Sequence, residues 1–566
     1  DVRDTLMGNS KNADCWFYAL NMVLLVELFS LFQPIYINID NYCTSMMINQ
    51  VYAEDGYNMF LNPVVCWVST FLGQLFPDAD GFLMLTRAVL LVGIGAVSYF
   101  IALHFKHWSE RLFWGAMFFF LIIEMNLFSD FFMVWSAFLS FVGMIWLLCA
   151  LKGVDVNKKW ILTGTFFLCC GLMWRLGGFC LFVPFILLDV GINFLFTSHG
   201  KKEKLQYIKK CCKVFWPVVL SVLVLLTLDY GYKHSEKYED SVSFCDEVSR
   251  IVDYPMKEYD EVKEQLSGIS RNDYESLQNY LYVDTDQITA EYCDKIASAG
   301  YISAFRFDIK ELVSKTYSLI ARFYGLINFR IWCIALGIVG MLFIFSGAPW
   351  YYKLELFFAG IGAYLIMIYL SFVGRLPERI MQSVLYAVMG TVLMLYMPQR
   401  DRRHEPKIWK DVAVLAFSAI IVWHLGSVEF VPHQSLWTAQ TGALDMPWEE
   451  LYASDTIYIW NVRDHRKNPM KYFMQQGKMA PEDFMAHNIC AGDWDFTQLC
   501  NKERLNHLGV PNPARALLER EKTYYIANDC DDMWTYLKEH FDPSVQAVQI
   551  GEIKKIPIWE FQSKNF

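Results

Sequence analysis

The sequence lacks the short motifs that mark several large classes of enzyme. Its 566 residues contain no GxGxxG, no P-loop, no GxSxG and no HExxH, so dinucleotide, P-loop, serine-hydrolase and zincin chemistry are not indicated. The eleven histidines are scattered, without the spacing of a zinc site. Charged residues make up only 19% and the net charge is −10, a balance that argues against nucleic-acid binding.

Two further absences concern cysteine pairing and processing. The fifteen cysteines show neither a disulfide framework nor metal-ligand spacing, and a bridge between Cys245 and Cys293 stays open because sequence alone does not decide pairing. We expect no cleavable signal peptide. The first apolar run carries Glu27 and lacks a small-residue cleavage site, so it is better read as an anchor that stays in the membrane.

Apolar residues are abundant: 55% of the chain is hydrophobic and 17% aromatic. A helix needs about 20 apolar residues to cross a bilayer. The sequence therefore predicts an α-helical polytopic membrane protein with about eleven spans, two of them (112–127 and 160–175) short enough to be half-length or tilted. The expected spans are 15–36, 85–103, 112–127, 132–151, 160–175, 176–196, 214–231, 327–347, 354–373, 382–397 and 411–428.

The loop charges predict how the chain lies in a plasma membrane. Lys and Arg concentrate in loops that share one side if the N-terminus is cytoplasmic, notably the basic run 201–213. This places residues 37–84, 232–326 and 429–566 outside. We therefore expect a catalytic transmembrane module (1–231, with its loop 37–84), a mostly helical external insert (232–326), further transmembrane helices (327–428) and a small extracytoplasmic α/β domain (429–566).

Local patterns support the last two external parts. In the insert, apolar residues recur at helical spacing, and 311–326 is amphipathic. In the tail, DTIYIW, KTYYIA and VQAVQI are typical of strands. FTQLCNKERLNHLG and DDMWTYLKEHF are typical of helices, the first of them closed by Gly509.

Four acidic residues near predicted membrane boundaries are candidates for catalysis. Asp40 lies where the first span ends, and Asp55 follows in the same external loop. Glu124 and Asp130 lie in a very short external turn, EMNLFSDFF, where they could bind a metal, orient a sugar hydroxyl or share a proton. The alternatives are a solvated acid for Asp40 and Asp55, and a helix cap for Asp130.

Three arginines on the same predicted side are candidates for binding an anion. Arg175, in WRLGG, emerges between two apolar runs. Arg375 and Arg379, in GRLPERI, are four residues apart and are expected to share one face at the start of a helix. A guanidinium group matches phosphate geometry well. The alternatives are contact with lipid headgroups for Arg175 and pairing with Glu378 for the other two.

The order of these parts resembles the GT-C superfamily of integral-membrane glycosyltransferases. Asp40 in the first loop, Asn62-Pro63 before an apolar helix, the acidic second loop and MWRLGGFCLFVPFIL carry the resemblance, chiefly over 14–200. That superfamily includes protein O-mannosyltransferases, lipid A aminoarabinose transferases and O-antigen glucosyltransferases. The GRLPERI segment and the tail are similar to uncharacterised bacterial members.

The resemblance implies transfer of a sugar from a polyprenyl-phosphate donor, outside the membrane and with inversion. Asp40 matches the family's catalytic base, Glu124 or Asp130 its second-loop acid, and the three arginines its phosphate-binding groups. The sequence departs from the family in having Asp40-Asn41 in place of a double acid. This leaves open whether a divalent metal, Mg²⁺ or Mn²⁺, takes part, and whether Asp40 or Asp55 is the base.

The implied partners are the lipid-linked donor, a cell-surface glycan, lipid or wall-polymer acceptor, and membrane lipids, with no nucleic acid. Three alternatives remain: a polymerase of lipid-linked oligosaccharides, a flippase or transporter of lipid-linked sugars, and a subunit without catalysis. A transporter predicts charges along a path through the bundle. Apart from Glu27, the ionisable residues of the spans are expected at the external end, which favours an enzyme.

Overall fold

The computed structural model describes most of the chain. The described residues are 2–30, 39–52, 54–77, 79–105, 108–119, 122, 132–153, 157–196, 200–302, 308–325, 327–344, 348–396, 455–461, 470, 473, 479–492, 494–553 and 555–565. The predicted span 411–428, and Glu124 and Asp130, lie outside them.

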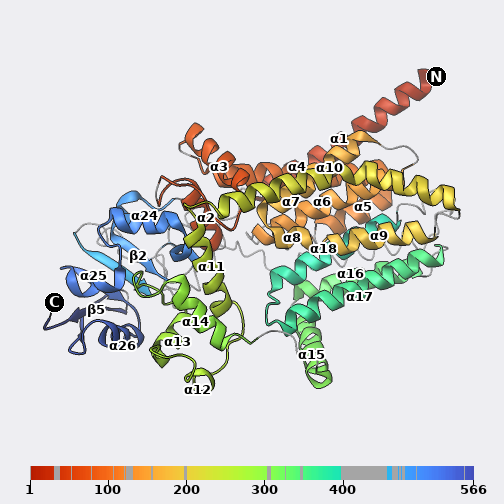
Figure 1. Cartoon of the computed structure of the whole chain (residues 1–566). Coiled ribbons are helices and arrows are strands. Elements are labelled where there is room, and N and C mark those ends of the chain that lie inside the picture. Colours follow the sequence, from red (N-terminus) through yellow and green to blue (C-terminus); the bar gives the residue numbers. More distant parts are fainter. Residues whose placement is uncertain are drawn as a thin grey trace.

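The N-terminal half is a bundle of helices (Figure 1). Its helices are α1 (Val2–Ser30), α2 (Ile39–Ile48), α3 (Pro63–Leu75), α4 (Gly81–His104), α5 (Trp108–Phe118), α6 (Phe132–Lys152), α7 (Lys158–Trp174), α8 (Leu176–Cys180), α9 (Val183–Phe196) and α10 (Lys201–Lys233). The bundle is completed by α16 (Ile327–Ile344), α17 (Trp350–Phe372) and α18 (Glu378–Tyr396).

Six helical stretches in the described part are long and apolar enough to cross a membrane. They are Gly81–His104, Phe132–Lys152, Leu176–Phe196, Lys201–Lys233, Trp350–Phe372 and Glu378–Tyr396. The chain is thus a multi-pass helical membrane protein, as the sequence predicts. The count of about eleven spans stays a prediction.

Helix α6 lies at the centre of the bundle, with every residue from Met133 to Leu151 buried. Small residues let α7 approach it closely. A Cβ on Gly143 would lie 2.6 Å from Leu168 Cγ, and one on Gly164 would lie 2.6 Å from Leu147 Cγ. Such close crossings favour helix association in lipid, where packing rather than water exclusion supplies the free energy.

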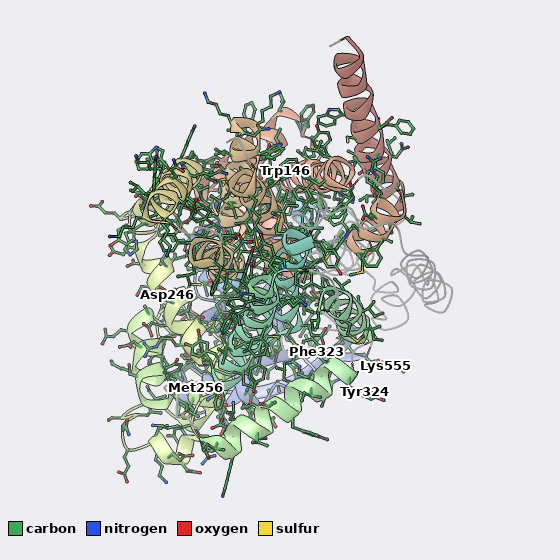
Figure 2. The ribbon with its side chains drawn as sticks, turned by 90° about the vertical axis from the view of Figure 1, so that its right-hand side faces the viewer. Trp146, Asp246, Met256, Phe323, Tyr324 and Lys555 are labelled. Atoms are coloured by element: carbon green, nitrogen blue, oxygen red, sulfur yellow. The ribbon has the colours of Figure 1, made fainter. Side chains whose placement is uncertain are left out.

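The insert is helical, as predicted. It contains α11 (Glu239–Val252), α12 (Tyr259–Val262), α13 (Arg271–Gln278), α14 (Ala290–Gly300) and α15 (Ile309–Gly325). Helix α15 runs across the direction of α17 in Figure 1. Figure 2 shows Trp146 within the bundle, Met256 in the insert and Tyr324 at the end of α15. Cys245 and Cys293 are buried and free, so the bridge left open by the sequence is not formed.

The tail carries a five-stranded sheet of order β2-β1-β3-β5-β4. Its elements are β1 (Ile457–Asn461), α23 (Glu482–His487), β2 (Asn488–Ala491), α24 (Leu499–His507), α25 (Pro513–Glu519), β3 (Thr523–Ile526), α26 (Asp531–His540), β4 (Gln546–Ile553) and β5 (Ile556–Gln562). Strand β1 pairs in parallel with β2 and β3, and β5 pairs antiparallel with β3 and β4. The predicted α/β domain is confirmed.

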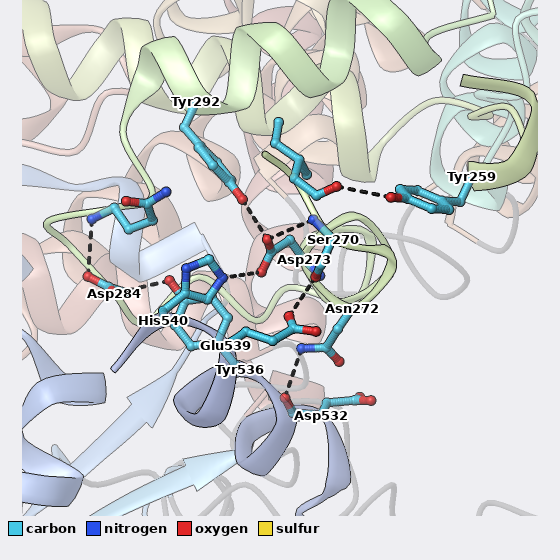
Figure 3. A network of polar contacts seen from close by, with 12 residues as sticks. Tyr259, Ser270, Asn272, Asp273, Asp284, Tyr292, Asp532, Tyr536, Glu539 and His540 are labelled. Carbon is cyan, nitrogen blue, oxygen red and sulfur yellow. Dashed lines mark hydrogen bonds and ion pairs between the residues drawn. The ribbon is translucent and has the colours of Figure 1, made fainter. Parts of the chain in front are cut away.

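The tail and the insert share one core and a polar network (Figure 3). Asp273 of α13 accepts a hydrogen bond from the Tyr292 hydroxyl (2.9 Å) and pairs with His540 Nε2 of α26 (2.8 Å). Asp284 accepts hydrogen bonds from Asn512 Nδ2 (2.7 Å) and the Tyr536 hydroxyl (3.0 Å). These buried bonds hold the tail against the insert.

Candidate functional site

Arg375 is placed by the way α17 ends. Gly374 has φ +76°, a left-handed conformation that suits glycine. The Gly374 N–H donates to the Ser371 carbonyl and the Arg375 N–H to the Leu370 carbonyl, which is the Schellman pattern of helix termination. The chain reverses here and sends Arg375 toward the insert.

The Arg375 side chain meets two residues of the insert that sequence reasoning missed. Its guanidinium forms an ion pair with Asp253, donates to the Tyr254 hydroxyl (3.0 Å) and lies over the Tyr254 ring, 4.9 Å from its centroid. Asp253 is the C-cap residue of α11. No local pattern marks these two residues, because the contact spans more than a hundred residues of chain.

Arg175 is placed by the tight junction between α6, α7 and α8. Its backbone is extended between α7 and α8, and its carbonyl accepts a hydrogen bond from the Ser136 hydroxyl (2.8 Å). A Cβ on Gly178 would lie 2.2 Å from Ser136 Oγ, so glycine is needed for this approach. The Arg175 guanidinium lies 5.3 Å from the Phe60 ring centroid and 5.4 Å from that of Phe132.

Arg379 lies in the first turn of α18, and Asp40 lies in the first turn of α2. Arg375 precedes α18, in the turn that ends α17, so the prediction that Arg375 and Arg379 share one helix face is wrong. Asp40, Asp253 and Arg375 all lie within electrostatic reach of Arg379. Arg175 in turn interacts with Arg375, Asp253 and Arg379. The fold therefore brings four of the predicted site residues, from three distant segments, into one electrostatic cluster with Asp253, which comes from a fourth. We call these five residues the arginine cluster.

Asp55 belongs to a different network. It accepts hydrogen bonds from the Tyr238 hydroxyl (2.6 Å) and the Tyr57 N–H (3.1 Å), and it pairs with Lys237 (2.8 Å). Burial and the bond to Asp55 raise the pKa of the Tyr238 hydroxyl, which therefore remains a donor. A carboxylate held by three donors is poorly placed to accept a proton from a substrate.

One group of side chains in the described part has ligand types suited to a metal: Asp273, Glu539 and His540 lie within 4.8 Å of one another. Each of them already has a protein partner, since Glu539 accepts from the Ser270 hydroxyl at 2.7 Å and the other two pair together. We therefore interpret it as part of the contact between tail and insert. Glu124 and Asp130, for which metal binding was one of three possibilities that the sequence left open, lie outside the described residues.

The arrangement defines a multi-pass helical membrane protein with a cationic cluster where the bundle meets the insert. Three guanidinium groups face two carboxylates, which leaves one positive charge among these side chains. Such a cluster can bind an anion, and an adjacent carboxylate can accept a proton.

Comparison with known proteins gives structural matches alone, since no protein-family model and no curated protein matches the chain. Two crystal structures of ArnT from Cupriavidus metallidurans match it, one in the apo state and one bound to undecaprenyl phosphate. The apo structure is 11% identical in sequence, and the match covers 96% of this chain and 96% of that chain. The bound structure is 10% identical, and the match covers 96% of this chain and 97% of that chain. The TM-score is 0.38 for both.

ArnT is a lipid A aminoarabinose transferase, a GT-C enzyme, and so belongs to one of the groups that the sequence resembles. A likeness at this TM-score carries no argument about activity. The function is therefore argued from the chain's own residues.

Proposed function

We propose that the chain is a membrane glycosyltransferase that transfers a sugar from a polyprenyl-phosphate donor to a glycan, lipid or wall-polymer acceptor, with inversion at the anomeric carbon. The observation that supports this most is the arginine cluster: Asp40 and Arg175 lie within electrostatic reach of Arg379, and Arg375 is fixed beside them by its contacts with Asp253 and Tyr254. In this reading the insert, the tail and the cluster lie on the extracytoplasmic side.

The chemistry requires one base and one anion site. The acceptor oxygen attacks C1 of the sugar while Asp40 takes its proton. The bond between C1 and the phosphate oxygen breaks, and the polyprenyl phosphate leaves with that electron pair. Arg175, Arg375 and Arg379 stabilise the negative charge that develops on the departing phosphate, because their positive charges are in place before the reaction.

The charges of the cluster match both sides of this reaction. Before transfer, the single positive charge left by three arginines and two carboxylates balances the single negative charge of a phosphodiester donor. After transfer, Asp40 is protonated and the cluster carries two positive charges. The product is a phosphate monoester with a charge of about −1.5 to −2. The positive charge of the cluster therefore still matches the negative charge of the bound phosphate. This balance needs no metal ion, and we expect transfer to survive EDTA.

The proposal is tested by incubating purified protein with a panel of radiolabelled polyprenyl-phosphate monosaccharides and measuring release of label to water or acceptor. Asp40→Asn should abolish release while the donor still binds. The matched control is Asp260→Asn, an exposed acid of the insert whose side chain is 61% exposed, which should leave release unchanged. Release that survives Asp40→Asn in folded protein would refute the role of Asp40.

A further inference from the structure

Three ionisable side chains meet inside the bundle, at the opposite end of α6 from the contact between Ser136 and Arg175. They are Lys152 at the end of α6, Asp189 in the middle of α9 and Glu355 near the start of α17. Asp189 and Glu355 have no exposed surface, and Lys152 is 12% exposed. The expectation that such residues gather at the other end of the spans is therefore wrong for this trio.

The contacts within the trio are unequal. Lys152 Nζ lies 2.5 Å from Asp189 Oδ2, and Asn193 Nδ2 donates to Asp189 Oδ1 at 3.0 Å. The Glu355 carboxylate has no hydrogen-bond donor at either oxygen among the described residues. The Asp189 carboxyl group lies within hydrogen-bonding reach of it.

Two ionised carboxylates cannot bond each other, because each only accepts hydrogen bonds. With one lysine beside them the trio would also carry a net negative charge in a low-dielectric interior, which is strongly unfavourable. A single proton between the carboxyl groups removes both problems, since it supplies the missing donor and makes the trio neutral.

The groups that face the trio from neighbouring helices do not replace that proton. Tyr207 of α10 and Tyr352 of α17 are both within electrostatic reach of Asp189 and Glu355, and Cys149 of α6 is within reach of Lys152. None of these three carries a positive charge, and the ammonium of Lys210 on α10 donates to the Gly153 carbonyl. The ammonium of Lys152 beside Asp189 also disfavours a metal cation at the same place.

We propose that Glu355 and Asp189 form a proton-binding site, in which one proton is held between the two carboxyl groups at neutral pH beside the Lys152 ammonium. The site joins α6, α9 and α17, so its occupancy is coupled to the packing of these three helices. This inference stands apart from the proposed transfer reaction, which uses residues at the other end of the bundle.

The test is infrared spectroscopy of the whole protein in nanodiscs at neutral pH, which detects the C=O band of a protonated carboxyl group. Compared with wild type, Glu355→Gln should lose one carboxylic-acid band, because the remaining Asp189 pairs with Lys152 and ionises. Asp189→Asn should lose the same band, since Glu355 then pairs with Lys152. Lys152→Met should about double the band, because both acids must then be protonated.

Glu264→Gln, an exposed acid of the insert, is the matched control and should leave the spectrum unchanged. An identical band in wild type and Glu355→Gln would overturn the proposal. Absence of the band in the wild-type protein would also overturn it. If thermal stability then depended on Na⁺ and not on K⁺, the carboxylates would hold a metal cation in place of the proton.

Discussion

The contact between tail and insert offers the sharpest energetic prediction. Asp273 is 2% exposed and accepts hydrogen bonds from the Ser270 N–H (3.1 Å) and the Tyr292 hydroxyl, besides its pair with His540. Asp273→Asn keeps the size of the side chain and removes its charge. The new amide has one NH₂ donor in place of an oxygen acceptor, so either His540 or the Tyr292 hydroxyl loses its hydrogen-bond acceptor.

The pair has a defined pH window. Burial opposes ionisation of Asp273, but its hydrogen bonds, chiefly that with His540, outweigh burial and lower its pKa. The bond to Asp273 raises the pKa of His540. The carboxylate therefore stabilises the fold above its ordinary pKa of about 3.9, and this stability is lost as pH falls through the lowered value. The histidine contributes fully below about 6.5, and that contribution is lost as pH rises through the raised pKa.

The magnitude follows from burial. Removing one partner of a buried ion pair typically costs about 3–5 kcal/mol. Since each 1.4 kcal/mol is a factor of ten, amide exchange in α26 should accelerate on the order of a hundredfold or more in Asp273→Asn, measured in nanodiscs at pH 6. The difference from wild type should shrink at pH 8.5, after correction for intrinsic exchange, because His540 loses its charge.

The matched control lies on the same helix. Arg271 pairs with Asp260, and their side chains are 52% and 61% exposed. Such pairs contribute about 0–1 kcal/mol, so Arg271→Gln should change α26 exchange less than about fivefold. If Asp273→Asn behaved like Arg271→Gln, the argument that this pair holds the tail would be refuted.

Three further outcomes follow from the bundle and its loops. Gly178→Ala forces a Cβ into α6 and should cost about 1–3 kcal/mol and reduce transfer, whereas Gly191→Ala, with open space around it, should do neither in thermal-unfolding and transfer assays. Asp55→Asn should lower thermal stability and yet retain measurable transfer, unlike Asp40→Asn; complete loss in folded protein would favour Asp55 as the base. Asn62 caps α3, so Asn62→Ala should lower stability by about 1 kcal/mol, and an unchanged unfolding midpoint would contradict this.

The elements of the tail that are marked by a local sequence pattern were predictable. The strand character of KTYYIA and the helix stop at Gly509 (φ +68°) are both found. Strands β2 and β5 were missed, because the first has four residues and the second contains Pro557. Burial patterns this short or interrupted do not separate strand from loop.

The candidate site also contains residues that local sequence marks and residues that only the fold brings together. Arg175, Arg375, Arg379 and Asp40 stand out locally as charges at the ends of apolar runs, so sequence suffices to name them as candidates. Asp253 was not predictable, because what marks it is an ion pair with Arg375 across the fold. Lone acids in apolar runs, such as Asp189 and Glu355, gain meaning only when helix packing brings them together.

The measurement that tests the central claim most directly is the affinity of undecaprenyl phosphate for the protein in nanodiscs, compared with Arg379→Gln. A hydrogen bond to a charged group contributes about 1.5–3 kcal/mol, so the variant should bind on the order of ten- to a hundredfold more weakly. Arg271→Gln, remote from the arginine cluster in sequence and exposed on the insert, should bind like wild type. Equal affinity of Arg379→Gln and wild type would contradict the assignment of the arginine cluster as the phosphate site.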